Sequence, residues 1–431
     1  MRQAAGNASM RRIASRQAGI ALIALVAFIG IAAAVFVVRS LNADALAAAQ
    51  NQRTVEALQA AREALLAFAA ADGNNRPGTL PCPDIDGDGD SLATTEYSSS
   101  NCVSFIGRLP WKRLRIPELR DASGELLWYA VSPAFHNAGP NNVMPAFMTG
   151  NTSDMLTITG LPDTFGAIVF APGPALQGQL RSGSLALNWH PNYLDGVNAT
   201  STLAFSAQLP GAAFNDRLMP ISSADLVAAA ERRVSREVAE ALKGYFDFHG
   251  FLPAPSAFDE LACVNTDLIA PGDCPSTPGI LAGRLPASMA PAAAYDAVGS
   301  DRPQNRPSSA LLNGTADSAQ FGQIWFQRQY WREHVIYLVS QNCVGPPATK
   351  CAAGSLDLRG AGGNVDNARF IVLVAGMPRP GQSRASPADK QSFGNYLEAP
   401  ALSAVQALAA GKAPTQVQVP AGTIVATPRT N

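Results

Sequence analysis

The chain has 431 residues, of which 47% are hydrophobic and 15% are charged, and its formal net charge is -1. This apolar content excludes an intrinsically disordered chain, which combines few apolar residues with a high charge. Basic and acidic side chains are nearly balanced, so no nucleic acid is expected as a partner. A polytopic membrane protein is also excluded, because only one continuously apolar stretch has the length that crosses a bilayer.

That stretch is Ile20–Val38, and it is preceded by four arginines without any acidic residue or lysine. About 17–25 apolar residues span a bilayer as a helix. The arginine bias predicts a single-pass protein of the inner membrane, with its N-terminus in the cytoplasm and the bulk of the chain in the periplasm. Two alternatives remain: a secretory signal cleaved after residues 32–34, and a plain signal anchor.

The segment that follows predicts a continuous helix. Ser40 to Ala71 contains no Gly and no Pro and is rich in strong helix formers, and Asp72-Gly73 then supplies a stop signal. We therefore expect one helix over residues 20–71, with its first half in lipid and its second half projecting outward. Such a helix is about 78 Å long.

The N-terminal residues resemble a known family. An arginine-rich leader, residues 1–19, ends in Gly19 and is followed at Ile20 by the apolar run. This pattern is similar to the N-terminus of type IV pilins and pseudopilins, and most of all to the large minor pseudopilin at the tip of the type II secretion pseudopilus. The resemblance implies cleavage by a prepilin peptidase between Gly19 and Ile20, methylation of the new N-terminus, and other pilin-like subunits as partners.

One position departs from most members of that family. Ala24 stands at the fifth mature position, where most pilins carry a glutamate. The tip-type pseudopilin also lacks this glutamate, and an unpaired carboxylate in a bilayer is costly. Ala24 therefore argues against a major repeating subunit, and it fits both a tip component and a protein that never enters a filament.

Beyond the first helix the sequence predicts an internal duplication. Six short motifs recur in the same order, and the last three recur 203 positions later. The pairs are Leu80–Pro83 with Leu252–Pro255, Gly107–Pro110 with Gly283–Pro286, Tyr129–Ser132 with Tyr337–Ser340, Ile168–Ala171 with Ile371–Val374, Gly178–Arg181 with Gly381–Arg384, and Asn192–Asp195 with Asn395–Glu398. The period is too long for a solenoid, so two related domains are expected.

Each half begins with a helix and continues in short strands. Apolar spacing predicts a helix from about Ala224 to Phe248, capped by Ser222 or Ser223 and ended by Gly250. The expected strands are Leu126–Val131, Ala167–Ala171, Val335–Val339 and Phe370–Ala375. The predicted fold class is α+β: a long N-terminal transmembrane helix, then two tandem duplicated periplasmic domains, each a helix on an antiparallel sheet. Their expected bounds are residues 72–220 and 221–412, followed by a flexible tail over 413–431.

The six cysteines predict disulfides in an oxidising compartment, because their number is even and they fall into local pairs. Fifteen connectivities are possible, and proximity favours Cys82 with Cys102, Cys263 with Cys274, and Cys343 with Cys351. Zinc binding is the rival interpretation, but no C-x-x-C occurs and the four histidines are scattered.

The segment Asp84–Asp90 is a candidate calcium loop. Asp84, Asp86, Asp88 and Asp90 occupy alternate positions, in the D-x-D-x-D-G spacing that places carboxylates around one cation. Position 12 of such a loop is Thr95 here, where an EF-hand has a glutamate. The competing interpretation is a solvated Asp/Gly turn beside a disulfide.

No catalytic motif is recognisable, so the chain is not expected to be an enzyme. The four histidines are isolated in the sequence, and Glu333-His334 is interpreted as packing and surface rather than as catalytic. The aromatic cluster of residues 325–331 is interpreted as core, or else as a partner-binding patch. The sequence favours a minor or tip component, or an assembly factor, of a type IV pilus or type II secretion system. The alternative is a membrane-tethered periplasmic binding module outside any filament; an envelope hydrolase has no support from individual residues.

Overall fold

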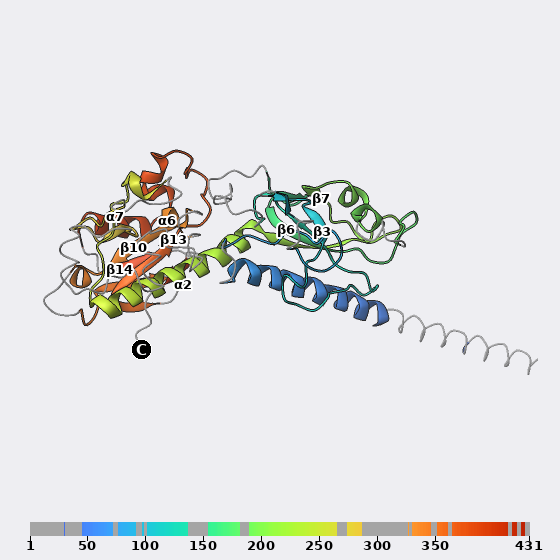
Figure 1. The fold of residues 1–431 in the computed structure, drawn as a ribbon, viewed down its shortest axis with the longest axis horizontal. Helices are drawn as coiled ribbons and strands as arrows, with labels where there is room; N and C mark the ends of the chain where they lie inside the picture. Colours follow the sequence, from blue (N-terminus) through green and yellow to red (C-terminus); the bar gives the residue numbers. More distant parts are fainter. Residues whose placement is uncertain are drawn as a thin grey trace, which may run out of the picture.

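The computed structural model describes residues 30, 45–71, 76–91, 97–98, 101–136, 154–181, 189–264, 274–286, 326, 330–345, 351–360, 364–412, 416–419 and 424–426. They form two lobes, here called the first and second domains, and the long helix α2 (Ser223–His249) runs from one to the other (Figure 1).

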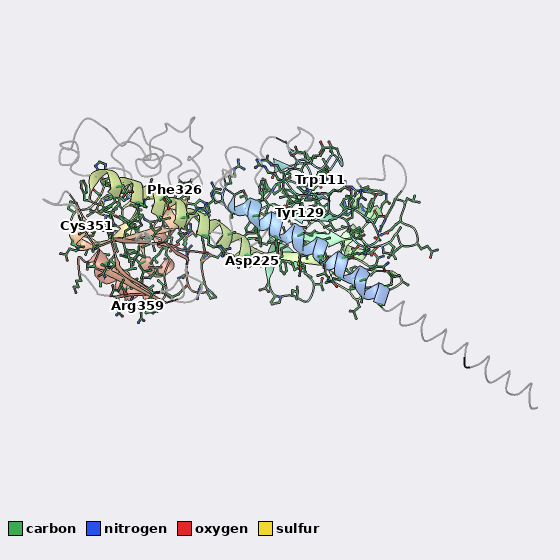
Figure 2. All side chains as sticks on the ribbon, turned by 90° about the horizontal axis from the view of Figure 1, so that it is seen from below. Trp111, Tyr129, Asp225, Phe326, Cys351 and Arg359 are labelled. Carbon is green, nitrogen blue, oxygen red and sulfur yellow. A yellow bond between two sulfur atoms is a disulfide. The ribbon has the colours of Figure 1, made fainter. Side chains whose placement is uncertain are left out.

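The first described helix covers residues 45–70 and packs along the first domain. Its buried side chains recur every three or four residues, which places them on one face of the helix. They are Thr54, Leu58, Ala61, Leu65 and Ala69. Figure 2 shows this helix lying beside the first domain rather than extending away from it. The apolar stripe explains this placement, because its exposure to water would be unfavourable.

The first domain is built on a sheet with strand order β3-β4-β6-β5-β7, in which β8 also pairs with β6. Its strands are β3 (Ile106–Arg108), β4 (Trp128–Val131), β5 (Leu156–Ile158), β6 (Thr164–Ala171), β7 (Ala204–Phe205) and β8 (Arg217–Ser222); β1 (Tyr97–Ser98) and β2 (Asn101–Cys102) form a separate hairpin. Two short 3-10 helices, η2 (His190–Asn192) and η3 (Gly196–Ala199), lie between β6 and β7 in the chain.

Both faces of this sheet are buried, as the continuously apolar β6 suggests. Tyr129 and Val169 belong to the core cluster that includes the helix over residues 45–70. Their strand neighbours Trp128 and Phe170 belong to a second cluster, with Tyr193. Successive side chains of a strand point to opposite faces, so a strand buried on both faces lacks a polar alternation.

Helix α2 begins and ends where the sequence predicts. Ser222 accepts a hydrogen bond from the Asp225 backbone N–H at 3.0 Å, and Gly250 ends the helix in the left-handed conformation at φ 77°. The helix contacts β6 and β8 of the first domain and β13 and β15 of the second. It also binds the first helix, because Arg62 and Asp225 form an ion pair at 2.8 Å. Figure 2 labels Asp225 near the crossing of the two helices.

The second domain contains two sheets, ordered β15-β13-β10-β9 and β12-β11-β14. The strands are β9 (Ala282–Arg284), β10 (Val335–Val339), β11 (Leu356–Gly360), β12 (Val365–Ala368), β13 (Phe370–Val374), β14 (Gln416–Val419) and β15 (Ile424–Ala426). The helices are η4 (Leu261–Cys263), α6 (Trp331–His334), η7 (Gln341–Cys343), η8 (Asp389–Gln391), η9 (Phe393–Asn395) and α7 (Ala401–Ala409). Part of the expected flexible tail is thus paired, since β14 and β15 extend the two sheets.

The predicted fold class is wrong in its transmembrane helix. The described part of the chain contains no helix that is both long enough and apolar enough to cross a bilayer. The predicted span Ile20–Val38 lies outside the described residues except for Gly30. The outer half of the predicted long helix, residues 45–70, is the helix that packs on the first domain. What the structure shows is mixed α and β content in two domains.

The paired motifs occupy corresponding places in the two domains. Gly107 pairs with Tyr129 across β3 and β4, and Gly283 pairs with Tyr337 across β9 and β10. The Tyr129 hydroxyl donates to the Pro81 carbonyl at 3.1 Å. The Tyr337 hydroxyl donates to the Pro253 carbonyl at 3.0 Å.

The register on the other side of the same strands also corresponds. Tyr129 lies opposite Val169 on β6, and Tyr337 lies opposite Val372 on β13. These two valines are 203 positions apart, which is the offset found in the sequence. Both glycines that face the tyrosines are sterically required: a Cβ on Gly107 would lie 2.6 Å from the Asp84 carbonyl oxygen, and one on Gly283 would collide with that of Ser256.

Candidate functional site

The acidic loop brings together three of its four predicted ligands. Carboxylate oxygens of Asp84, Asp86 and Asp88 all lie within 4.8 Å of one another. Asp84 is held by paired backbone hydrogen bonds with Arg108 at the end of β3. The loop then turns at Gly87 and Gly89, whose φ angles of 84° and 85° favour glycine.

Hydrogen bonds within the loop fix the buried carboxyl. Asp84 accepts the backbone N–H groups of Gly87 at 2.6 Å and Gly89 at 2.8 Å. Burial raises the pKa of Asp84 to about 6; the two N–H donors act in the opposite direction, and the charges of Asp86 and Asp88 raise it further. Asp90 is not in the group of three, and its carboxylate accepts the Ser91 N–H at 2.7 Å.

The donor set suits calcium among the common metals. Carboxylate oxygens are hard ligands, and calcium takes six to eight oxygens in flexible geometry. The described loop supplies three such side chains, and Asp86 and Asp88 are exposed to solvent that can complete a coordination shell. Thr95 and Glu96, the residues near the twelfth position, lie outside the described residues.

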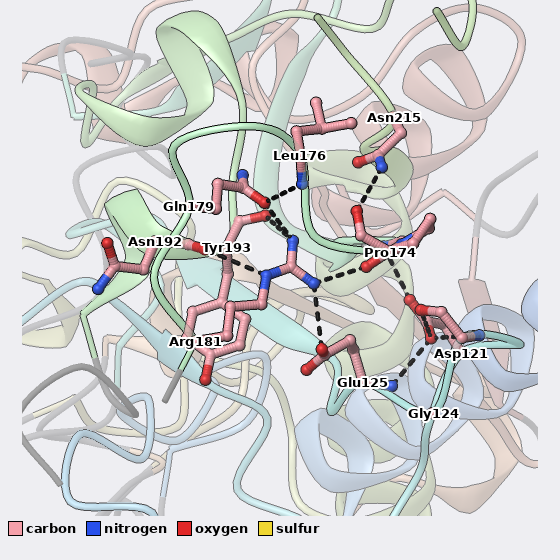
Figure 3. Close-up of polar contacts among 12 residues, drawn as sticks. Asp121, Gly124, Glu125, Pro174, Leu176, Gln179, Arg181, Asn192, Tyr193 and Asn215 are labelled. Atoms are coloured by element: carbon pink, nitrogen blue, oxygen red, sulfur yellow. Dashed lines mark hydrogen bonds and ion pairs between the residues drawn. The ribbon is translucent and has the colours of Figure 1, made fainter. Parts of the chain in front are cut away.

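A second polar cluster surrounds Arg181, which the sequence marked only as part of a repeated motif (Figure 3). Its Nε donates to the Asn192 carbonyl at 3.1 Å and its Nη1 to the Gly173 carbonyl at 2.7 Å. Nη2 donates to Gln179 Oε1 at 2.6 Å. Nη1 also pairs with Glu125 at 3.2 Å. Every nitrogen of this guanidinium thus has a partner.

Asp121 holds the turn that carries Glu125 against this cluster. Its Oδ1 accepts the backbone N–H groups of Ser123 at 2.8 Å and Glu125 at 3.0 Å. Its Oδ2 accepts the Gly173 N–H at 2.8 Å, next to the carbonyl that Arg181 binds (Figure 3). The pair Asp121 and Glu125 therefore has a structural role, in which one carboxylate fixes a turn and the other neutralises an arginine.

The second domain repeats the arginine cluster 203 positions later. Arg384 Nε donates to the Asn395 carbonyl at 2.7 Å, and Nη1 donates to the Gly376 carbonyl. The guanidinium lies over the ring of Tyr396 at 4.3 Å, as that of Arg181 lies over Tyr193 at 4.9 Å.

The surroundings of the two arginines differ. Nη1 of Arg181 forms an ion pair with Glu125, whereas Nη1 of Arg384 forms a hydrogen bond with His334 Nδ1 at 3.1 Å. Among the described residues, Nη2 of Arg384 makes no hydrogen bond, and the buried carboxyl of Glu231 on α2 lies in the same region. Sequence reasoning missed these groups as a site. The recurring Gly-Gln-x-Arg motif was the available signal, but nothing in it pointed to residue 231.

The remaining predicted residues are placed as follows. Gly19 and Ile20, the predicted processing site, lie outside the described residues. The six cysteines form three disulfides with the local pairing that proximity favours: Cys82–Cys102, Cys263–Cys274 and Cys343–Cys351.

The histidines and aromatic residues lie in packed surroundings. His136 and His334 are buried, and burial lowers the pKa of each, that of His136 to about 4. Phe326 and Trp331 have 0% and 2% of their surface exposed, which confirms core packing for these two members of the aromatic cluster. Figure 2 labels Phe326 within the second domain.

The chain matches no known family model, no curated protein and no solved structure.

Proposed function

We propose that the protein is an exported structural and interaction protein of pilin-like design, acting as a minor or tip component or an assembly factor of a pilus or secretion filament. The observation that carries this proposal is architectural. In each domain a helix lies on a sheet whose central strands are antiparallel, and corresponding hydrogen bonds support these strands in both. A duplicated head of this kind offers two related surfaces for neighbouring subunits.

The disulfides support an oxidising compartment, such as the periplasm, as the place where the domains work. Each bridge closes a short loop, because the cysteines of the three pairs are 20, 11 and 8 positions apart. Structural disulfides persist in secreted and periplasmic proteins and are rare where thiols are kept reduced. Bridges across short loops stabilise a fold mainly by restricting the unfolded chain.

The N-terminal residues supply the test of the pilin-like proposal. Mass spectrometry of the mature protein should find an N-terminus at Ile20, methylated, with the leader through Gly19 removed. A mature N-terminus at Met1, or cleavage after Ala34, would refute the proposal. Crosslinking in cells should then capture other pilin-like subunits, whose absence would exclude a place in a filament.

A second candidate function is an exported binding module that acts outside any filament. The specific observation in its favour is a cavity of about 430 Å³ beside α2, lined by Glu231 and Arg384. Its volume lies in the range of small-molecule sites, about 300–1,000 Å³. Binding of a ligand by the purified chain, without any captured subunit, would favour this function over the first.

A further inference from the structure

The cavity lies between the first half of α2 and the segment that follows β13. Its walls combine apolar side chains, among them Val227, Met377 and Leu397, with a few charged ones. This composition is typical of pockets in which an apolar surface holds the body of a ligand and polar groups fix its orientation. Two charged residues in it, Glu231 and Arg384, have bonding capacity that the described protein does not use.

Glu231 is the first of these groups. Its side chain is 95% buried, since only 5% of the residue surface is exposed. It forms no hydrogen bond or ion pair with any described residue, and its Oε1 lies against Gly376, where an added Cβ would collide with it. Burial raises the pKa of Glu231 to about 8, although the nearby charges of Arg232 and Arg384 act in the opposite direction. No described cation forms a direct ion pair with this carboxylate, so the two nearby arginines offset only part of its desolvation.

Arg384 is the second group, and the comparison with Arg181 shows what it lacks. Arg181 donates from Nη2 to Gln179 and pairs with Glu125. Gln179 and the corresponding Gln382 each accept a backbone N–H three residues earlier, from Leu176 and Arg379. Unlike Gln179, Gln382 accepts no hydrogen bond from its arginine, and Arg384 forms no ion pair with a described carboxylate. Bonds from Nε and Nη1 hold the guanidinium in place, so its remaining donor has a fixed direction.

We propose that this cavity binds a small zwitterion, an α-amino acid or dipeptide with an apolar side chain. The ammonium group would pair with Glu231, the carboxylate with Arg384 Nη2, and the side chain would contact Val227, Met377 or Leu397. A ligand with both charges complements a site that presents one acid and one base, whereas a simple amine or a simple acid leaves one of them without a partner.

The test uses the purified full chain and isothermal titration calorimetry at neutral pH. The probes are L-leucine and glycyl-L-leucine, with 3-methylbutylamine and 4-methylpentanoic acid as ligands that each lack one charge. We expect a zwitterion to bind at millimolar concentration or below, and each single-charge ligand to bind at least about tenfold more weakly, a difference of about 1.4 kcal/mol. Binding should also release protons, because an ammonium group favours the ionised form of Glu231.

Matched variants locate the site. Glu231→Gln should weaken binding at least about tenfold, and Glu240→Gln, an exposed change on the same helix, should leave it unchanged. Ala228→Leu should block binding by filling the cavity, since both residues are good helix formers. Circular dichroism verifies that each variant is folded.

The proposal is refuted if neither zwitterion binds at millimolar concentration, if the amine binds as tightly as the zwitterions, or if folded Glu231→Gln binds like the wild type. The inference rests on the binding-module function alone, because the titration involves no other subunit. Failure of ligand binding therefore leaves the processing and crosslinking results to decide the filament proposal separately.

Discussion

Replacement of Glu231 by glutamine should change how the stability of the protein depends on pH. The pKa of this carboxyl is about 8 in the folded chain against 4.5 as the ordinary value. The folded state therefore holds the proton more tightly than the unfolded state. The resulting stability is fully present below pH 4.5 and is lost progressively as the pH rises toward 8.

The magnitude follows from the two pKa values. Each unit of difference corresponds to about 1.4 kcal/mol, so the whole shift amounts to about 5 kcal/mol. Between about pH 5 and pH 7 the wild type should lose about 2.5 kcal/mol more unfolding free energy than Glu231→Gln, which cannot ionise at this position. Because the side chain is only 5% exposed, solvent screening does not reduce this figure much.

The assay is urea denaturation of both proteins at the two pH values, since urea, unlike guanidinium, leaves the ionic strength unchanged. Burial also raises the pKa of Asp216, to about 7. Its effect on the pH dependence is the same in both proteins, so it cancels in the difference between them. Glu240→Gln should follow the wild type. Parallel pH dependence of the wild type and Glu231→Gln would show that Glu231 ionises normally, and the reasoning from its burial would then be wrong.

Three further predictions concern the repeated motifs and the acidic loop. Tyr129→Phe and Tyr337→Phe each remove one buried hydrogen bond to a proline carbonyl, so each should lower the unfolding free energy by about 1 kcal/mol in urea titrations; unequal losses would contradict the correspondence of the two domains. Gly283→Ala should cost about 3 kcal/mol because its Cβ meets a carbonyl oxygen, and an unchanged Tm would contradict this geometry. If the loop binds calcium, a free calcium concentration of about 100 times Kd should raise the unfolding free energy by about 2.7 kcal/mol. Chelation should then lower the Tm of the wild type but not that of Asp86→Asn. A wild-type Tm that changes with neither calcium nor chelator would refute calcium binding.

The repeated motifs were visible in the sequence because the backbone allows few substitutes at these positions. Gly107 and Gly283 face carbonyl oxygens that exclude any side chain. Tyr129 and Tyr337 each need both a ring and a hydroxyl. Such positions keep their residue in both halves, so a comparison of the chain with itself finds them. The strand Val335–Val339 and the cap at Ser222 were predictable for a similar reason, since local pattern and capping chemistry determine them.

The cavity was not predictable, because its charged groups come together only through the tertiary fold. Glu231 lies on α2 and Arg384 follows β13, more than 150 positions later in the chain. In the sequence, Glu231 looks like one of several acidic residues of an amphipathic helix. The packing of the first helix, by contrast, was open to prediction, because its buried residues from Thr54 to Ala69 recur at ordinary core spacing.

Helix α2 also sets the relative orientation of the two domains. It has 27 residues, is therefore about 40 Å long, and packs on the sheets of both domains. One residue inserted in the middle of it would advance one domain by about 1.5 Å and rotate it by about 100° against the other. The number of residues in α2 therefore sets the rotation of one domain relative to the other. Insertions and deletions are tolerable in the loops, but within α2 only those close to a whole number of helical turns preserve the direction in which each domain faces.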